Sequence, residues 1–158
     1  MKFEELKSQI EERMKDLGAE VSGKEPNVVD VKVSREKIVE AAKRLKEMGF
    51  DHVKAVTAID YPNERFEVVY VSSSYSNLEL AYFIVNLRTD LPYDDPKMPS
   101  LLEVWPSVLY QEHEEHDLIG IMFEGHPRMG ERLLLPESYE GIPPLRKEFK
   151  VKTEGINA

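Results

Sequence analysis

The sequence contains no cysteine. Without thiols, the chain cannot form a disulfide, hold a cysteine-ligated iron–sulfur cluster or use a thiol as a nucleophile. Long apolar runs are absent as well, since no stretch approaches the ~20 apolar residues of a membrane-spanning helix. The opening residues, MKFEELK, lack the apolar region of a signal peptide. We therefore expect no direct membrane span and no bound cofactor of the thiolate-ligated kind.

Basic residues are fewer than acidic ones. The chain has 30 acidic residues against 21 basic ones, for a net charge of −9. Nucleic-acid phosphates require a basic footprint, so we expect no nucleic-acid partner. Nucleotide-binding and nucleophile motifs are missing too: no Walker A, GxGxxG or GxSxG occurs, and every glycine stands singly.

The apolar residues that are present predict two N-terminal helices. Those of residues 3–17 recur at helical spacing, and Gly18 can end that helix in a left-handed conformation. Ser34 is a candidate N-cap for a second helix, whose buried stripe runs from Ile38 to Met48 before Gly49. We expect coil between these helices from 19 to 27, followed by a short strand at 28–33.

Three further strands are predicted downstream of the second helix. Residues 53–59 and 66–71 have hairpin spacing around a turn at 60–64, and residues 78–87 are rich in β-formers. The prolines of residues 89–99 favour a loop. Ser100 and Glu103 have capping-box spacing before an apolar run, which predicts that a helix or a helical turn starts there. A further helix is expected from about Pro106 to Leu118.

The pattern as a whole predicts an α+β fold. We expect a single two-layer domain, residues 1–135, with helices packed on a small mixed or antiparallel sheet. Residues 136–158 lack helical or strand periodicity and contain Pro136, Pro143 and Pro144. Because proline fixes φ and removes a backbone donor, we expect these residues to form an extended C-terminal arm.

Ionisable residues are densest between positions 112 and 117. The run contains four carboxylates and two histidines: Glu112, His113, Glu114, Glu115, His116 and Asp117. On a helix, 112, 115, 116 and 119 share one face, and 113, 114 and 117 another. Such a run indicates a metal site, proton transfer, a partner surface or simply a solvated helix face.

Spacing argues against the metal interpretation without removing the others. A zinc-binding helix of the HExxH kind places its histidines four apart, whereas His113 and His116 are three apart. A di-iron site needs Glu three residues before His, and His113 occupies that position before His116. Glu112 and His116 do lie four apart, so a two-ligand site stays open, as does an acid–base pair in a cleft.

The surrounding motifs resemble a known family. Residues 112–149 are similar to the 30 kDa (C-type) component of respiratory complex I, with the family pattern Glu-Arg-Glu-x-x-Asp-x-x-Gly-Ile-x-Phe-x-Gly-His-Pro, then Arg-x-Leu-x-Pro-Glu and Pro-Leu-Arg-Lys. The likeness extends back to about residue 35, through 56–62 and 65–70. The short length and His116-Asp117-Leu118 resemble the branch in membrane-bound NiFe hydrogenases and sulfane reductases.

Several residues match that pattern position by position. Those assigned to the partner interface and structural signature are Glu112, Glu114, Asp117, Gly120, His126, Pro127, Arg132, Arg146 and Lys147. Phe123, Pro136 and Leu145 match as well. The chain departs from the pattern at three places. His113 replaces an arginine, Arg128 replaces an aspartate, and residues 129–131 include an insertion.

The resemblance implies a non-catalytic subunit. In the family this subunit binds no cofactor and no metal, has no catalytic residue, and contacts the NiFe-hydrogenase-like large subunit in the hydrophilic arm of the complex. An iron–sulfur subunit lies nearby, so iron–sulfur clusters and, in some members, NiFe belong to partners. The implied location is peripheral, on the cytoplasmic side of the cell membrane, in electron transport and ion translocation.

A second hypothesis from the residues themselves is a free-standing enzyme. It would use the 112–117 cluster for metal-dependent or acid–base chemistry. The sequence leaves open which electron acceptor, ion and organism are involved.

Overall fold

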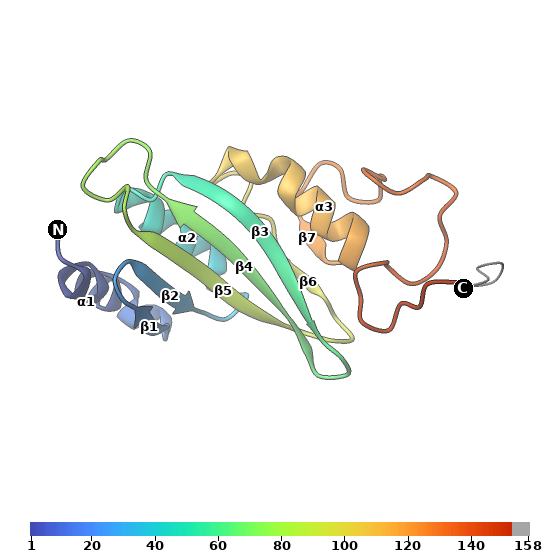
Figure 1. Ribbon diagram of the computed structural model, residues 1–158, viewed down its shortest axis with the longest axis horizontal. Helices are drawn as coiled ribbons and strands as arrows, with labels where there is room; N and C mark the ends of the chain where they lie inside the picture. The colour runs from blue at the N-terminus through green and yellow to red at the C-terminus, as the bar shows by residue number, and fades with distance from the viewer. Residues whose placement is uncertain (153–158) are drawn as a thin grey trace, which may run out of the picture.

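The computed structural model describes residues 1–152 and shows a five-stranded mixed sheet with helices and a long C-terminal segment (Figure 1). The expected α+β class is confirmed. The helical elements are α1 (Phe3–Met14), the 3₁₀ turn η1 (Lys15–Leu17), α2 (Ile38–Glu47), the 3₁₀ turn η2 (Pro106–Val108) and α3 (Leu109–Ile119). The strands are β1 (Glu20–Lys24), β2 (Val28–Lys32), β3 (His52–Tyr61), β4 (Arg65–Ser73), β5 (Ile84–Pro92), β6 (Lys97–Pro99) and β7 (Met122–Glu124).

The large sheet has the order β1-β2-β5-β4-β3. β3, β4 and β5 are antiparallel neighbours, whereas β2 pairs with β5 in parallel. This order leaves β3 at one edge of the sheet, and Figure 1 shows α3 beside that edge. β6 and β7 form a separate parallel pair that flanks α3 in the sequence.

Alternation along the strands builds the core on one face. Tyr70 of β4 lies opposite Val56 and Leu87, and all three are buried. In Figure 1, α2 lies behind the sheet, where its apolar stripe joins the same core as that of α1. Burying these stripes supplies the main stabilisation of both helices.

The other face of the sheet carries a network of ion pairs. Arg88 contacts Asp30 at 2.6 Å and Glu67 at 3.1 Å. Lys32 contacts Asp90 at 2.8 Å and Glu67 at 3.5 Å. These groups neutralise one another across three neighbouring strands, which lets Glu67 be largely buried beneath them.

The N-terminal half differs from expectation in two places. Residues 20–24 were expected to be coil, but they form β1, because a polar edge strand pairs through its backbone and carries no apolar signal. Ser34 is not an N-cap: α2 begins at Ile38, and the Ser34 carbonyl instead accepts the N–H of Lys37 in a preceding turn.

The boundaries of β5 were also wrong. The expected strand at 78–87 begins only at Ile84, after a turn, and continues to Pro92 through part of the expected 89–99 loop. Lys97–Pro99 adds β6 within the same expected loop. Proline is tolerated at strand ends, which explains why these residues pair in spite of their composition.

The helix or helical turn expected after Ser100 is a single turn, in which the N–H groups of Val104 and Trp105 donate to the Leu101 carbonyl. The Ser100 hydroxyl accepts the N–H of Leu102 and donates to Glu112, so its partner is the distant glutamate and not Glu103. The helix expected from Pro106 is present as η2 and α3, and β7 follows shortly after Gly120.

Residues 125–152 contain no helix or strand, so the stretch without regular structure begins before the arm of residues 136–158 that the sequence predicts. From here on, the arm means residues 128–152. The last part of the expected arm, 153–158, lies outside the described residues. No helix within residues 1–152 is long and apolar enough to cross a membrane.

Candidate functional site

Helix α3 is closed by a glycine that the arm covers. Gly120 has φ of +87°, and its N–H donates to the carbonyls of Glu115 and His116. Such left-handed closure is typical of glycine. A Cβ at this position would lie 2.9 Å from Arg146 Nη2 and 3.2 Å from Pro143, so the arm packs directly over the helix end.

The charged run of α3 is mostly buried. Glu112, His113 and Asp117 are at most 2% exposed and Glu115 is 8% exposed, whereas Glu114 is exposed. The interpretation of this run as a solvated helix face is therefore wrong. Buried charges need partners, and each of these carboxylates has partners elsewhere in the chain.

Glu112 lies at the centre of a polar cluster inside the core. It accepts hydrogen bonds from Tyr70 Oη at 2.8 Å, Ser100 Oγ at 2.5 Å and the N–H of Leu101 at 2.9 Å. Burial raises the pKa of Glu112, and these three bonds oppose the rise. Burial and the neighbouring carboxylate raise the pKa of Tyr70 well above its usual value. Glu112 therefore joins α3 to β4 and to the segment after β6.

Glu115 caps the free edge of the sheet. Its Oε2 accepts the N–H of Ala58 in β3 at 2.9 Å. Burial raises the pKa of Glu115 to about 7, the Ala58 N–H lowers it, and Glu114 adds to the rise. An unpaired edge N–H is a site for unwanted strand pairing, and this carboxylate occupies it.

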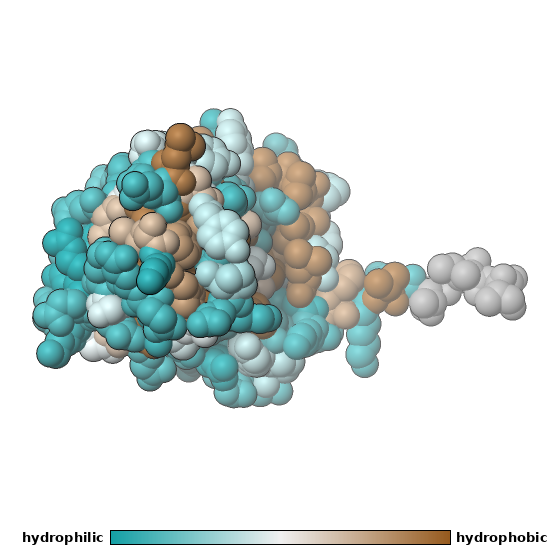
Figure 2. Space-filling model, turned by 60° about the vertical axis from the view of Figure 1, so that its left-hand side comes forward, coloured by the Kyte–Doolittle hydropathy of each residue, from teal (hydrophilic) through white to brown (hydrophobic). Residues whose placement is uncertain are grey.

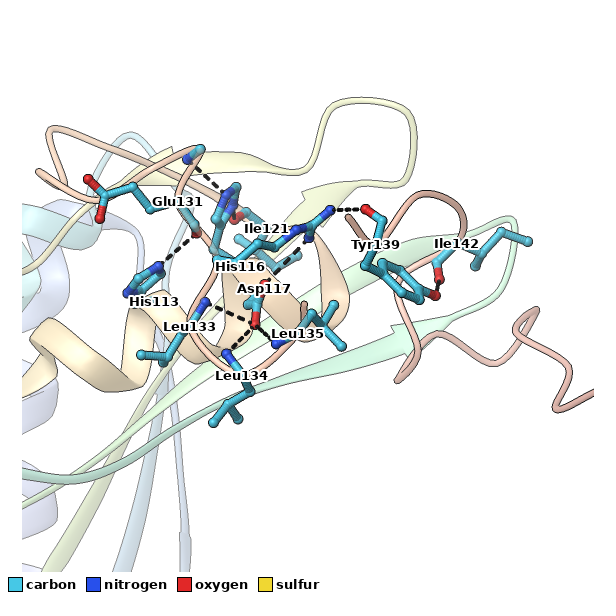
Figure 3. A network of polar contacts seen from close by, with 12 residues as sticks. His113, His116, Asp117, Ile121, Glu131, Leu133, Leu134, Leu135, Tyr139 and Ile142 are labelled. Carbon is cyan, nitrogen blue, oxygen red and sulfur yellow. Dashed lines mark hydrogen bonds and ion pairs between the residues drawn. The ribbon is translucent and has the colours of Figure 1, made fainter. Parts of the chain in front are cut away.

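Asp117 holds the start of the arm (Figure 3). Its Oδ2 accepts the backbone N–H groups of residues 133, 134 and 135 at 3.3, 2.8 and 3.0 Å, and Arg132 Nη1 lies 3.4 Å from Oδ1. Burial alone would raise the pKa of Asp117, but these bonds outweigh it and lower the pKa. The position of Asp117 in the sequence, at the junction between helix and turn, predicts that it is buried or partly buried and accepts hydrogen bonds from backbone groups or from arginine or lysine. This prediction is confirmed.

The three histidines of the signature region bond to backbone groups. His113 Nε2 contacts the carbonyl of Glu131 at 2.8 Å. His116 Nδ1 contacts the carbonyl of Ile121, and its Nε2 accepts the N–H of Gly130. His126 Nε2 contacts the carbonyl of Leu109, and its Nδ1 accepts the N–H of Arg128.

Carbonyl partners require an N–H on the imidazole, so these contacts define the tautomers. His116 and His126 thereby use both ring nitrogens within the chain, and no lone pair is left to bind a metal. His113 Nδ1 is buried without a protein partner. Within residues 1–152, no group of three His, Cys, Asp or Glu side chains is placed to hold a metal ion.

The arm returns to the domain at residues 145–147. The N–H of Leu145 donates to Leu118 O at 3.0 Å, Arg146 Nε donates to Ile119 O at 2.7 Å, and the N–H of Lys147 donates to Asp60 at 2.8 Å. The Arg146 guanidinium also lies over the Phe66 ring at 5.0 Å. The arm is thus fixed at both ends against α3 and the β3–β4 hairpin.

The signature residues therefore divide into two groups. Glu112, Asp117, Gly120 and His126 are internal joints of α3, whereas the side chains of Glu114, Pro127, Arg132 and Lys147 are exposed and Arg146 is half-buried. The sequence did not indicate Tyr70, Ala58 or Asp60 as partners. The alternation of Phe66, Val68 and Tyr70 along β4 is the signal that could have placed Tyr70 on the inward face.

Comparison with known proteins shows which family the chain belongs to. The family model described as the respiratory-chain NADH dehydrogenase 30 kDa subunit matches residues 31–155. The chain belongs to this family. The resemblance drawn from the signature is confirmed, and the protein is a complex I 30 kDa-type subunit.

Relatives carry different names within that family. The C-type subunit of the NADH-quinone oxidoreductase of Moorella thermoacetica is 39% identical over 68% of this chain and 69% of its own length. The C-type subunit of the F(420)H(2) dehydrogenase of Methanosarcina mazei is 31% identical over 94% of this chain and 89% of its own length.

Solved structures agree with the fold. A chain of the membrane-bound sulfane sulfur reductase, an archaeal respiratory membrane complex, superposes with a TM-score of 0.82 at 27% identity, covering 93% of this chain and 85% of that one. The trypsin-resistant fragment of Nqo5 superposes with a TM-score of 0.66 at 31% identity, covering 77% and 97%.

Proposed function

We propose that this chain is a non-catalytic subunit in the hydrophilic arm of a complex I-related membrane-bound oxidoreductase. In this proposal it is peripheral on the cytoplasmic side and holds the NiFe-hydrogenase-like large subunit, beside an iron–sulfur subunit, while electrons pass through those partners. Iron–sulfur clusters and, depending on the complex, NiFe would belong to the partners. The names of its relatives support this setting, since they include subunits of an NADH-quinone oxidoreductase and of an F(420)H(2) dehydrogenase, and a membrane-bound sulfane sulfur reductase complex.

The observation that carries the proposal is the use of the charged cluster. Three of its carboxylates are bonded inside the chain, to Tyr70, to the β3 edge and to the arm. These bonds fix α3 and the arm in one geometry and leave no open, convergent set of acid, base and nucleophile among the described residues. The cluster therefore supports a framework role better than a chemical one.

The arm supplies a surface for the large subunit. Leu134, Ile142 and Leu145 are exposed, although the N–H groups of Leu134 and Leu145 donate to residues of α3. Figure 2 shows apolar atoms gathered on the side from which the C-terminal stretch leaves the molecule. An apolar segment held in place before binding loses less entropy when a partner covers it.

The differing names of the relatives fit this role. Their names refer to NADH and quinone, to F(420)H(2) or to sulfane sulfur, although this chain is similar in sequence to the first two proteins and in fold to the third. A subunit that positions the large subunit without touching these different substrates would be retained among all of them. Specificity for the electron donor and acceptor would then lie in other subunits.

The test is co-purification with a tagged large subunit. We expect Leu134→Asp with Leu145→Asp to lower the recovery of this chain at least tenfold, because two charges would be buried in an apolar contact. The matched control is Tyr110→Asp, an equally exposed position on α3. Wild-type recovery of the double variant would contradict the proposal.

The alternative hypothesis, a free-standing enzyme, can be tested separately on the purified chain. A metal-dependent activity of the 112–117 cluster requires about one zinc, nickel or iron per chain after dialysis, with activity lost on chelation. We expect elemental analysis to find no stoichiometric transition metal, because His116 and His126 already use both ring nitrogens. A stoichiometric metal would overturn the framework role.

A further inference from the structure

The connection between β4 and β5 displays large side chains to solvent. Tyr75, Leu78 and Tyr82 are 66%, 89% and 59% exposed, whereas Leu80 and Phe83 of the same connection are buried in the core. The buried pair anchors the loop, and the exposed three form its outer side. Tyrosine is enriched at the centres of protein interfaces because it offers a large contact area at a low cost in side-chain entropy.

Hydrogen bonds hold the backbone of this loop in one conformation. The carboxylate of Asp51 accepts the N–H groups of Tyr75 at 2.9 Å and Ser76 at 3.1 Å. At the other end, Asn27 Nδ2 donates to the carbonyl of Tyr82 at 2.9 Å. Neighbouring residues from two other parts of the chain thus fix both ends of the loop.

The two tyrosine rings are also supported. Tyr75 stacks on His52 with ring centroids 4.1 Å apart, and Tyr82 meets the buried Phe83 edge to face at 5.6 Å. Rings that are oriented before binding lose little freedom when a partner covers them. The loop therefore has the properties of a preformed contact and not those of a mobile connection.

Charge around the loop restricts the partner. Glu79 is the only charged residue between 74 and 83. Glu12 borders the hollow beside Asn77 and Leu80, and Arg13, which also borders it, pairs with Glu47 at 3.8 Å. This acidic rim disfavours anionic membranes and nucleic acid and complements a basic protein surface.

The loop lies at the end of the sheet opposite the arm (Figure 1). We propose that residues 74–83 are a second docking site, which receives a protein subunit whose surface offers an apolar recess bordered by lysine or arginine. The proposal rests on membership of a multi-subunit complex but not on the arm, because the two surfaces are separate.

Site-specific photo-crosslinking in the intact complex tests this contact. A benzophenone amino acid replaces Leu78 in the full-length chain, and another replaces Tyr110 as the matched exposed control. We expect the probe at 78 to join one partner subunit, at an apolar stretch flanked by basic residues, and the probe at 110 not to join that stretch. A crosslink only to lipid, only to a second copy of this chain, or to no polypeptide would overturn the proposal.

Charge reversal gives an independent readout. With the probe at 78, Glu79→Lys should lower the crosslink yield several-fold at low salt and less at high salt, while unfolding of the variant stays as in wild type. An unchanged or higher yield would count against a basic rim. If Leu134→Asp with Leu145→Asp releases the large subunit but the crosslink at 78 persists, this contact stands on its own. If the large subunit is retained and the crosslink is absent, only the loop proposal fails.

Discussion

A carboxylate in the last turn of a helix faces the negative end of the helix dipole, and Asp117 occupies that position in α3. Burial adds a desolvation penalty. Three successive backbone N–H groups and Arg132 offset both effects, because they satisfy the charge and lower its pKa. The arm and the aspartate therefore depend on each other: the side chain needs these donors, and the backbone of 133–135 needs this acceptor.

Removing the carboxylate should destabilise the chain. We expect Asp117→Ala to lower the free energy of unfolding by about 1–3 kcal/mol, because it leaves backbone donors without their acceptor. Urea denaturation measures the change, and proteolysis should reach residues 133–135 sooner. The control, Glu114→Ala, removes an exposed carboxylate of the same helix and should change stability by less than about 0.5 kcal/mol. Equal effects of the two substitutions would contradict this role.

Glu115 makes the stability of the chain depend on pH in the sense opposite to that of Asp117. Its folded pKa of about 7 exceeds the ordinary 4.5, so between these values the native state holds the proton more tightly than the unfolded chain. Its contribution is present below pH ~4.5 and is lost as pH rises towards 7. Asp117, whose pKa is lowered, instead contributes above its ordinary value of 3.8 and loses that contribution as pH falls.

Glu115→Gln isolates this titration. Glutamine keeps an acceptor for the Ala58 N–H but carries no charge. The variant should therefore unfold at a higher urea concentration than wild type at pH 8, and at a similar urea concentration at pH 5. The difference should reach up to about 3 kcal/mol, following the ~1.36 kcal/mol associated with each pKa unit. Urea denaturation between pH 5 and 8 measures it, with Glu114→Gln as control. Parallel pH profiles for wild type and Glu115→Gln would refute the assignment.

At the scale of the element, α3 shows what the sequence can and cannot predict. Pro106 begins the 3₁₀ turn that leads into α3, and Gly120 closes α3 in the left-handed conformation typical of glycine. The burial of Glu115 was not predictable in the same way, because it depends on the β3 edge 57 residues earlier in the chain. Periodicity in α3 mixes charged and apolar residues on each face, so it did not indicate which charges would be inside.

The same reasoning explains the strand errors. β1 pairs through its backbone and none of its side chains is buried, and the run at 78–83 is apolar because some of its side chains anchor a loop while others are exposed. In both segments, the amino-acid composition indicates whether the side chains are buried or exposed, but it does not indicate whether the backbone pairs in a sheet. The fold class and the C-terminal signature were predictable, whereas the internal partners Tyr70, Ser100 and Asp60 needed the tertiary structure.

Two glycines allow the fit between α3 and the arm to be measured. Gly120 and Gly130 both have φ of +87°, but a Cβ at 120 meets Arg146 and Pro143, and one at 130 meets nothing within 4 Å. Alanine at either site should destabilise by about 1–2 kcal/mol through backbone strain. We expect Gly120→Ala to exceed Gly130→Ala in urea denaturation, and the excess to shrink in an Arg146→Ala background. Equal effects would show that the arm does not press on the helix end.

At the scale of the whole molecule, one core supports surfaces at opposite ends. The sheet and helices bury a continuous apolar cluster from α1 to β7, and the arm contributes none of its described residues beyond 129 to that cluster. The arm instead joins the domain through polar contacts at 132–135 and 145–147. Folding and partner binding should therefore be separable.

Truncation tests that separation. Removing residues 136–158 leaves the Asp117 contacts with 133–135 in place but deletes the contacts of Leu145, Arg146 and Lys147. We expect the shortened chain to keep its circular dichroism spectrum and its cooperative unfolding. Its stability should fall modestly, because Asp60 and the last carbonyls of α3 would accept hydrogen bonds from water in place of the arm. Binding to the large subunit should be abolished, because Ile142 and Leu145, two of the exposed apolar side chains of the arm, are removed. Co-purification at the full-length yield would show that another surface holds the large subunit. Failure to fold would show that the domain extends past residue 135, so that the contacts at 145–147 belong to the core's own stability.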